Sequence, residues 1–154
     1  MAKKATAHDA GVILQLYDLR REAEMRKARH WFVVDFWPQS ADEILKIASA
    51  LGTQENNWLR QVGSYWDMAA ALVNHGAIDL ELFNDTNGEH ISVFAKVEAL
   101  IGDVRATFGA QYLANLEKLI DDTKGGRERV AATRERMKGM RAKIAAMRAT
   151  AATS

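Results

Sequence analysis

The chain has 154 residues, of which 48% are hydrophobic and 27% are charged, and its formal net charge is +1. These values are ordinary for a soluble globular domain and exclude a disordered chain. The absence of cysteine excludes disulfides, thiol catalysis and thiolate metal sites. No apolar run is long enough to span a bilayer, and the first eleven residues do not resemble a signal peptide, so we expect a cytoplasmic protein.

A single proline and many Ala, Leu, Glu, Lys, Arg and Met residues favour helix throughout. We therefore predict an all-α fold, a bundle of about six helices with a basic amphipathic C-terminal helix. The predicted organisation is a flexible N-terminus over residues 1–8, a helical bundle over residues 9–123, and a basic helix with a frayed tail over residues 124–154.

The first helix is predicted from residue 10 to residue 37, with Asp9 as its N-cap and Pro38 beyond its end. Its last seven residues are rich in aromatic and β-branched side chains and also suit a strand. We prefer helix because no other segment offers a partner strand. His30 lies in this apolar end and is predicted to be a core residue.

The next three helices each follow a residue that can cap a helix N-terminus, namely Ser40, Thr53 and Asp79. Gly52 and Gly76 can adopt the left-handed conformation that ends the first two of these helices. A loop over residues 84–88 separates the third helix from the next.

A helix is predicted over residues 89–108, followed by Gly109 and a shorter helix that ends near residue 122. Glu98 and Arg105 lie seven residues apart beside an apolar stripe, and we expect them to pair across the bundle. Residues 123–126, which contain two glycines, form the best hinge of the chain.

Charge is distributed unevenly along the chain. Residues 124–148 contain nine Lys or Arg residues and two Glu residues, a balance of +7, whereas residues 1–123 have a balance of −6. Such asymmetry between segments suggests an interaction tail.

The final helix also has a seven-residue apolar repeat whose two borders are positively charged. The repeat and its surroundings give ten candidate interaction residues: Arg129, Arg134, Arg136, Lys138, Arg141, Lys143, Arg148, Met137, Met140 and Ile144. Border positions of this kind choose the partner of a coiled coil, so two copies of the helix repel and a homodimeric zipper is disfavoured. The oligomeric state of the whole protein stays open.

We therefore expect a non-enzymatic scaffold or interaction protein whose C-terminal helix engages an acidic surface, either its own body or a partner protein. The alternative is sequence-nonspecific binding of nucleic acid or an anionic membrane surface through the same helix. The helix supplies charge for phosphates but contains no aromatic or amide side chain for reading bases. Its apolar face lacks the Trp, Phe and Leu residues typical of membrane-surface helices.

No sequence motif identifies a catalytic, cofactor or metal site. The four histidines have none of the spacings of metal ligands, and His75 suits a position at a helix C-terminus. The four tryptophans could line a pocket between helices, which makes an enzyme with an aromatic-lined pocket the third hypothesis.

Three segments carry a family resemblance: residues 16–29 (LYDLRREAEMRKAR), residues 64–73 (SYWDMAAALV), and residues 76–79 (GAID) with the Leu-Phe pair that follows. A later helix ends near Arg105. With this pattern the chain resembles a family of small bacterial helical proteins of unknown function over about residues 10–120. The resemblance implies a helical fold, and it brings no activity or site residue.

Overall fold

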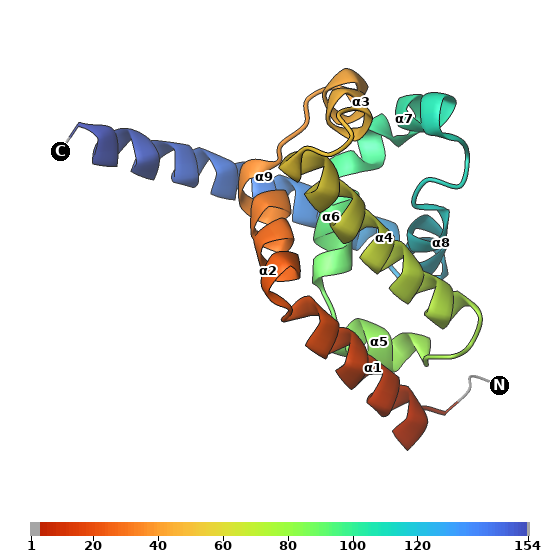
Figure 1. Cartoon of the computed structure of the whole chain (residues 1–154). Coiled ribbons are helices and arrows are strands. Elements are labelled where there is room, and N and C mark those ends of the chain that lie inside the picture. Colours follow the sequence, from red (N-terminus) through yellow and green to blue (C-terminus); the bar gives the residue numbers. More distant parts are fainter. Residues whose placement is uncertain (1–3, 154) are drawn as a thin grey trace.

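The computed structural model describes residues 4–153 and confirms the all-α fold, with no strand anywhere in this range. Nine α-helices, one π-helical segment and one 3₁₀ turn follow one another along these residues (Figure 1). Their bounds are α1 Ala7–Arg20, α2 Ala23–His30, η1 Trp31–Asp35, α3 Ala41–Ser49, α4 Gln54–Asn74, α5 Leu80–Thr86, α6 Glu89–Val97, η2 Glu98–Leu100, α7 Ile101–Phe108, α8 Ala114–Asp122 and α9 Gly126–Ala152. Among the described residues, eight α-helices precede α9, where about six were predicted for the bundle, because two long predicted helices are interrupted.

The helix predicted over residues 10–37 is divided into three parts. α1 ends at Arg20, and the carboxylate of Glu22 caps α2 by accepting a hydrogen bond from the amide of Met25 at 2.9 Å. The amide of Met25 lies in the first turn of α2 and has no acceptor within that helix, so the carboxylate of Glu22 supplies one. This cap favours the start of a new helix over the continuation of α1. The chain bends here, and α2 packs against α4 (Figure 1). The apolar end, Trp31–Asp35, is π-helical and not a strand.

The N-cap of α1 is Thr6, and the prediction of Asp9 as the cap is wrong. The two residues form a capping box in which each side chain accepts a hydrogen bond from the other's backbone N–H, at 3.3 and 2.7 Å. Asp9 also accepts from the amide of Asp79 at 3.0 Å, which ties the start of α1 to the start of α5. The predicted flexible N-terminus is therefore helical from Ala7, and its residues 1–3 lie outside the described part of the chain.

The C-terminal helix is longer than predicted. It begins at Gly126, the last residue of the predicted hinge, directly after Gly125, which has a φ of +69°, and it continues to Ala152. A Cβ at Gly126 would lie 2.0 Å from the carbonyl oxygen of Ile120, so only glycine allows this close approach between α8 and α9. The predicted frayed tail is helical up to Ala152, and Ser154 lies outside the described residues.

The predicted caps inside the bundle are confirmed. The side chains of Ser40, Thr53 and Asp79 accept hydrogen bonds from the amides three residues ahead and start α3, α4 and α5. Gly52 and Gly76 have φ values of +85° and +76°, in the left-handed region that ends a helix. The boundaries of these helices are thus set by local hydrogen bonds and glycine geometry.

The helix predicted over residues 89–108 is also interrupted. A 3₁₀ turn at Glu98–Leu100 separates α6 from α7, and α7 then packs against α3. A 3₁₀ turn has three residues per turn, so it changes the direction in which the following side chains point.

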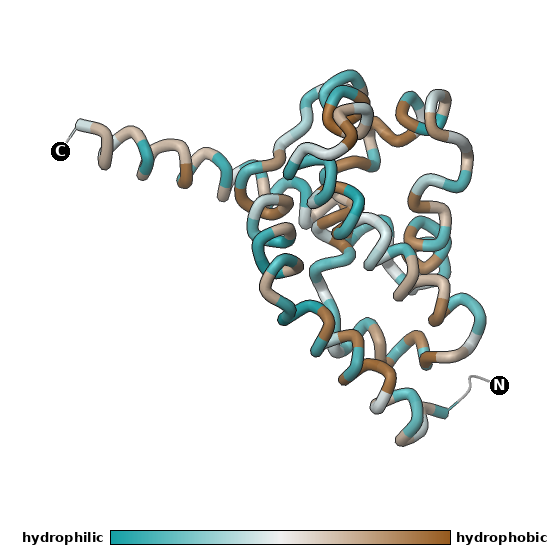
Figure 2. The backbone as a smooth tube through the Cα atoms, in the orientation of Figure 1, coloured by the Kyte–Doolittle hydropathy of each residue, from teal (hydrophilic) through white to brown (hydrophobic). Residues whose placement is uncertain are grey.

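The core is built around α4 and α6. α4 packs against α2, α3 and α8, and α6 packs against α8 and α9. Trp66, Phe83 and Phe94 are the largest fully buried side chains. Figure 2 shows hydrophobic residues gathered within the body, whereas the part of α9 that leaves the body is mostly pale or teal.

The prediction for one histidine is wrong and that for another is confirmed. His30, predicted to be a core residue, is exposed on α2. His75 is the C-cap residue of α4, as predicted. His90 is the buried histidine, and neither of its ring nitrogens hydrogen-bonds to another described residue. Its ring lies 5.7 Å from the ring of Trp66 and 5.2 Å from that of Phe83. Burial, with smaller effects of Arg129 and Arg20, lowers the pKa of His90 to about 4.

We predict that His90 makes the fold sensitive to mild acid. The pKa of His90 is lower in the folded state than the ordinary histidine value of 6.5, so on acidification the unfolded chain binds the proton first. The free energy of unfolding should therefore fall as the pH drops from about 6.5 towards 4, by up to roughly 3 kcal/mol. Urea unfolding of the wild type, His90→Phe and His90→Gln across this range measures the effect.

Both His90 variants should lose the part of the pH dependence that the wild type shows between pH 6.5 and 4. His30→Gln, which removes an exposed histidine, should keep it. If the free energy of unfolding fell with pH by the same amount in the wild type and in the two His90 variants, the prediction would be contradicted.

Candidate functional site

The C-terminal helix α9 has two halves that differ in burial. Residues 126–137 pack against α6 and α8, and their apolar ridge buries Val130, Thr133 and Met137. Beyond Met137 no residue up to residue 153 is buried, and the helix leaves the body (Figure 1). The helix therefore packs on the body with its first half and projects with its second half.

Arg127 holds the first half of α9 on the body. Its guanidinium pairs with Glu98 at 2.9 Å, with Glu117 at 2.9 Å and with Asp121 at 2.6 Å, and it lies 5.4 Å from the ring centre of Phe94. Hydrogen bonds to Asp121 and Glu117 raise the pKa of Arg127. Sequence analysis missed this residue, although its place directly after the hinge, close behind two aspartates, was a usable signal.

Arg134 is the predicted site residue that joins this cluster. It pairs with Glu98 and donates to the carbonyl oxygen of Ala95 at 3.2 Å. The predicted pair of Glu98 and Arg105 is wrong, because Arg105 pairs with Glu117 at 2.5 Å and both partners of Glu98 come from α9. Contacts across 29 and 36 residues decide this pairing, and the local spacing does not reveal them.

Three other predicted residues, which lie in the first half or directly after it, are exposed. Arg129 makes no ion pair or side-chain hydrogen bond within residues 4–153, and Arg136 donates to the hydroxyl of Thr133 at 3.3 Å. Lys138 pairs with Glu135 along the helix at 2.9 Å. None of these three contacts a helix of the body through an ion pair.

The predicted residue Met137 is buried in the first half of α9, and the second half carries the remaining predicted residues. Met140 is 49% exposed and Met147 is 71% exposed, while Ile144 between them is half-buried. These three side chains, which we call the outer ridge, continue the apolar repeat beyond the body.

The cations beside the outer ridge differ in how they are held. The guanidinium of Arg141 lies 5.7 Å from the ring centre of Trp37, and that of Arg148 pairs with Asp35 at 2.9 Å. Lys143 has no ion pair with any residue from 4 to 153. Because the Arg148 pair is largely exposed, it contributes little to stability and leaves the arginine available.

Lys96 supports the place where α9 leaves the body. Its ammonium donates to the carbonyl oxygens of Phe32, Val33 and Phe36 at 2.5, 2.8 and 2.6 Å, and it lies 3.8 Å from the ring centre of Trp37. Burial lowers the pKa of Lys96 to about 7, whereas the three carbonyl acceptors favour the charged form. The three acceptors belong to the π-helical segment and its C-cap residue, so Lys96 fixes the position of this segment and of the Trp37 ring next to it.

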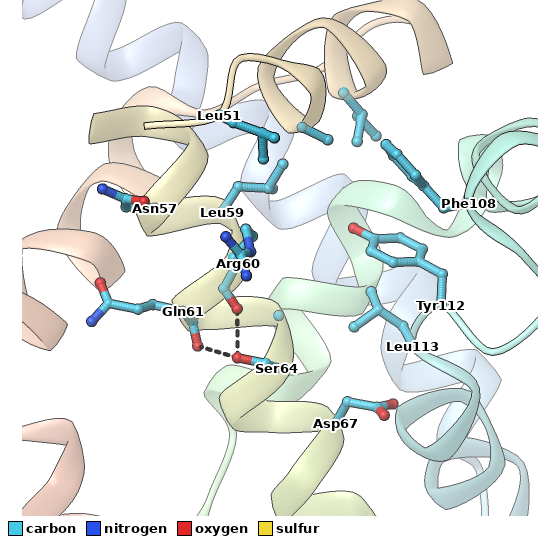
Figure 3. A pocket seen from close by; sticks show the side chains of 13 residues that line it. Leu51, Asn57, Leu59, Arg60, Gln61, Ser64, Asp67, Phe108, Tyr112 and Leu113 are labelled. Atoms are coloured by element: carbon cyan, nitrogen blue, oxygen red, sulfur yellow. Dashed lines mark hydrogen bonds between the residues drawn. The ribbon is translucent and has the colours of Figure 1, made fainter. Parts of the chain in front are cut away.

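A separate cleft of about 770 Å³ opens between α3, α4, α7 and the segment before α8 (Figure 3). Its lining residues are mostly apolar and include no tryptophan. The predicted aromatic pocket does not form as one site: Trp31 and Trp37 line another hollow of about 490 Å³, and Trp66 is part of the core. Sequence reasoning missed the cleft because its walls come from four separate elements.

We predict that the two halves of α9 respond differently to the same substitution. Met137→Ala removes a side chain that is only 8% exposed and should lower the free energy of unfolding by about 2 kcal/mol. Met147→Ala, on the same ridge but projecting, should change it by less than about 0.5 kcal/mol. Urea denaturation followed by circular dichroism measures both, and equal losses would contradict this division of the helix.

No helix within residues 4–153 combines the length and hydropathy needed to cross a bilayer, and no three His, Asp or Glu side chains in this range are grouped to hold a metal ion.

The comparisons with known proteins bear on the body of the chain. No curated protein and no solved structure matches the chain. A sequence model of the family described as Domain of unknown function (DUF4760) matches residues 5–123. The chain therefore belongs to this family of domains of unknown function.

Proposed function

We propose that the chain is a non-enzymatic interaction protein in which the helical body holds α9 and the projecting half of α9 binds an acidic amphipathic helix of a partner protein. One observation carries the proposal: the outer ridge continues the apolar repeat into solvent, with positive side chains on both of its borders. Burial of this ridge under a partner helix is favourable, because it removes apolar surface from water.

The borders of the outer ridge indicate the chemistry of the partner. Arg141 and Arg148 lie on one border, and Arg136 and Lys143 lie on the other. A second copy of α9 would bring like charges together, whereas glutamates at the facing positions of another helix would pair with them. The charge pattern therefore favours a different, acidic chain over a homodimer.

The length and composition of the projecting half favour adaptable binding. Residues 138–152 span roughly 22 Å at the rise of an α-helix, which is about two heptads. A coiled coil this short is weak on its own, so its affinity depends on both the apolar ridge and the charges. Methionine side chains are flexible and polarisable, and they suit surfaces that fit more than one partner.

Nucleic-acid binding is the less favoured alternative. α9 contains no aromatic, Asn or Gln side chain, so it offers phosphate contacts but no stacking or base reading. An enzymatic role has less support, because the cleft contains one acidic and one basic side chain, and the acid, Asp67, is already hydrogen-bonded to Asn115 and to the amide of Leu116. A pair of free acid and base groups is therefore lacking there.

The test uses the full chain and a synthetic helical probe. The probe is a labelled three-heptad peptide with Leu and Ile at the core positions and Glu at the borders, and fluorescence anisotropy measures its binding. We expect wild-type protein to bind it, and Lys143→Glu/Arg148→Glu to bind it at least about tenfold more weakly, a loss of about 1.4 kcal/mol. Affinity should fall as salt rises.

Two matched controls separate this site from general charge attraction. Arg26→Glu/Lys46→Glu makes the same change in net charge on exposed residues of the body and should leave the affinity within twofold. A peptide of the same composition with its heptad order scrambled should bind much more weakly than the probe. Equal binding of both peptides, or tight salt-sensitive binding of random duplex DNA without binding of the probe, would refute the proposal.

A further inference from the structure

We propose that the cleft between α3, α4 and α7 is a binding site for a lipid-like carboxylic acid, with the hydrocarbon body against the apolar walls and the carboxylate between Arg60 and the hydroxyl of Tyr112. This site lies on residues that the outer ridge of α9 does not use. It is therefore independent of the proposed partner binding.

The size and walls of the cleft suit an apolar molecule. Its volume of about 770 Å³ lies within the range of small-molecule sites. Ile44, Leu59 and Leu113 form the buried wall, while Leu51 at 77% exposure and Phe108 at 37% exposure stand at its rim. Single exposed apolar residues are common, but here two large ones stand at the rim of one opening, and the opening leads to a buried apolar wall.

Two polar groups in the cleft lack protein partners. The guanidinium of Arg60 and the hydroxyl of Tyr112 make no ion pair or hydrogen bond with any side chain or backbone group of residues 4–153. Figure 3 shows the hydroxyl of Tyr112 pointing across the cleft toward α4, the helix that carries Arg60. A guanidinium and a neutral hydroxyl are both donors, and a carboxylate accepts from both.

The other ionisable groups of the cleft are consistent with an anion at this end. Burial raises the pKa of Tyr112 to about 12, so its hydroxyl remains a donor at neutral pH. Asp67 is the acidic residue of the lining, and its oxygens accept from Asn115 Nδ2 at 2.9 Å and from the amide of Leu116 at 3.0 Å. It lies seven residues from Arg60 on α4, or roughly 10 Å along the helix, so the two charges mark opposite ends of the cleft.

The backbone of the wall is strained. Leu113 has a φ of +52° and is the one residue other than glycine with positive φ between residues 4 and 153. A left-handed conformation costs about 1–2 kcal/mol for a residue with a Cβ. Opposite it lies Gly63, where an added Cβ would stand 3.7 Å from Leu113 Cδ2. Strain of this kind is typical of ligand clamps, where the surroundings hold a residue in place.

The experiment measures binding of decanoate to the full-length protein by isothermal titration calorimetry, with decanol as the uncharged probe of equal chain length. We expect saturable one-to-one binding of decanoate, at least about tenfold tighter than that of decanol. Arg60→Gln should remove this preference by weakening decanoate about tenfold and leaving decanol unchanged. Tyr112→Phe should weaken decanoate by a few-fold, because the ring stays and one donor is lost.

Two further variants make the result decisive. Ser64→Trp places a bulky ring into the cleft from an exposed position of α4 and should abolish the binding of both probes. Arg26→Gln, which removes an exposed arginine of α2, should change neither. Equal affinity for decanoate and decanol, an unchanged preference in Arg60→Gln, or full binding by Ser64→Trp would each overturn the proposal, provided that melting curves show folded variants.

Discussion

The need to cover α6 on every side governs this structure. Six of the nine residues of α6 are buried, including His90 and Phe94, so the helix has no polar face wide enough to meet solvent. A helix that is apolar nearly all round is stable only inside a body. α8 covers one side and the first half of α9 covers another, with Val130 fully buried and Arg127 lying over the ring of Phe94. The first half of the basic helix is therefore part of the core, and its second half projects from the body.

The division of charge along the chain becomes a division in space. The acidic body meets the first half of α9 through Glu98, Glu117 and Asp121, which neutralise Arg127 and Arg134. These pairs are partly exposed, so each contributes modestly to stability, but together they fix which face of α9 turns inward. The body leaves other cations of α9 unpaired: Arg129 in the first half and Lys143 in the second half have no ion pair within residues 4–153. The same geometry that packs the helix thus exposes its charged end.

Sequence reasoning succeeded where structure depends on neighbours in the chain. The caps at Ser40, Thr53 and Asp79 are hydrogen bonds across three residues, and a composition of helix formers with one proline determines the all-α class. It failed where contacts join distant segments. The pair of Arg29 and Glu89 spans 60 residues, and the carbonyl contacts of Lys96 span a similar distance. For the candidate site, the outer ridge followed from a seven-residue period, whereas the cleft did not, because no local pattern brings its walls together.

The boundary of the family match has a structural consequence. The match ends at residue 123, just before α9, yet Val130 and Met137 on that helix complete the cover of α6. Residues 5–123 of this chain alone would expose this face, so here the part that the family model matches is covered by a helix from outside the match. In this chain the covering helix is also the one that projects. Any partner that binds the outer ridge is thereby connected through a continuous helix to the most buried element of the body, because bending α9 near Met137 would break its hydrogen bonds.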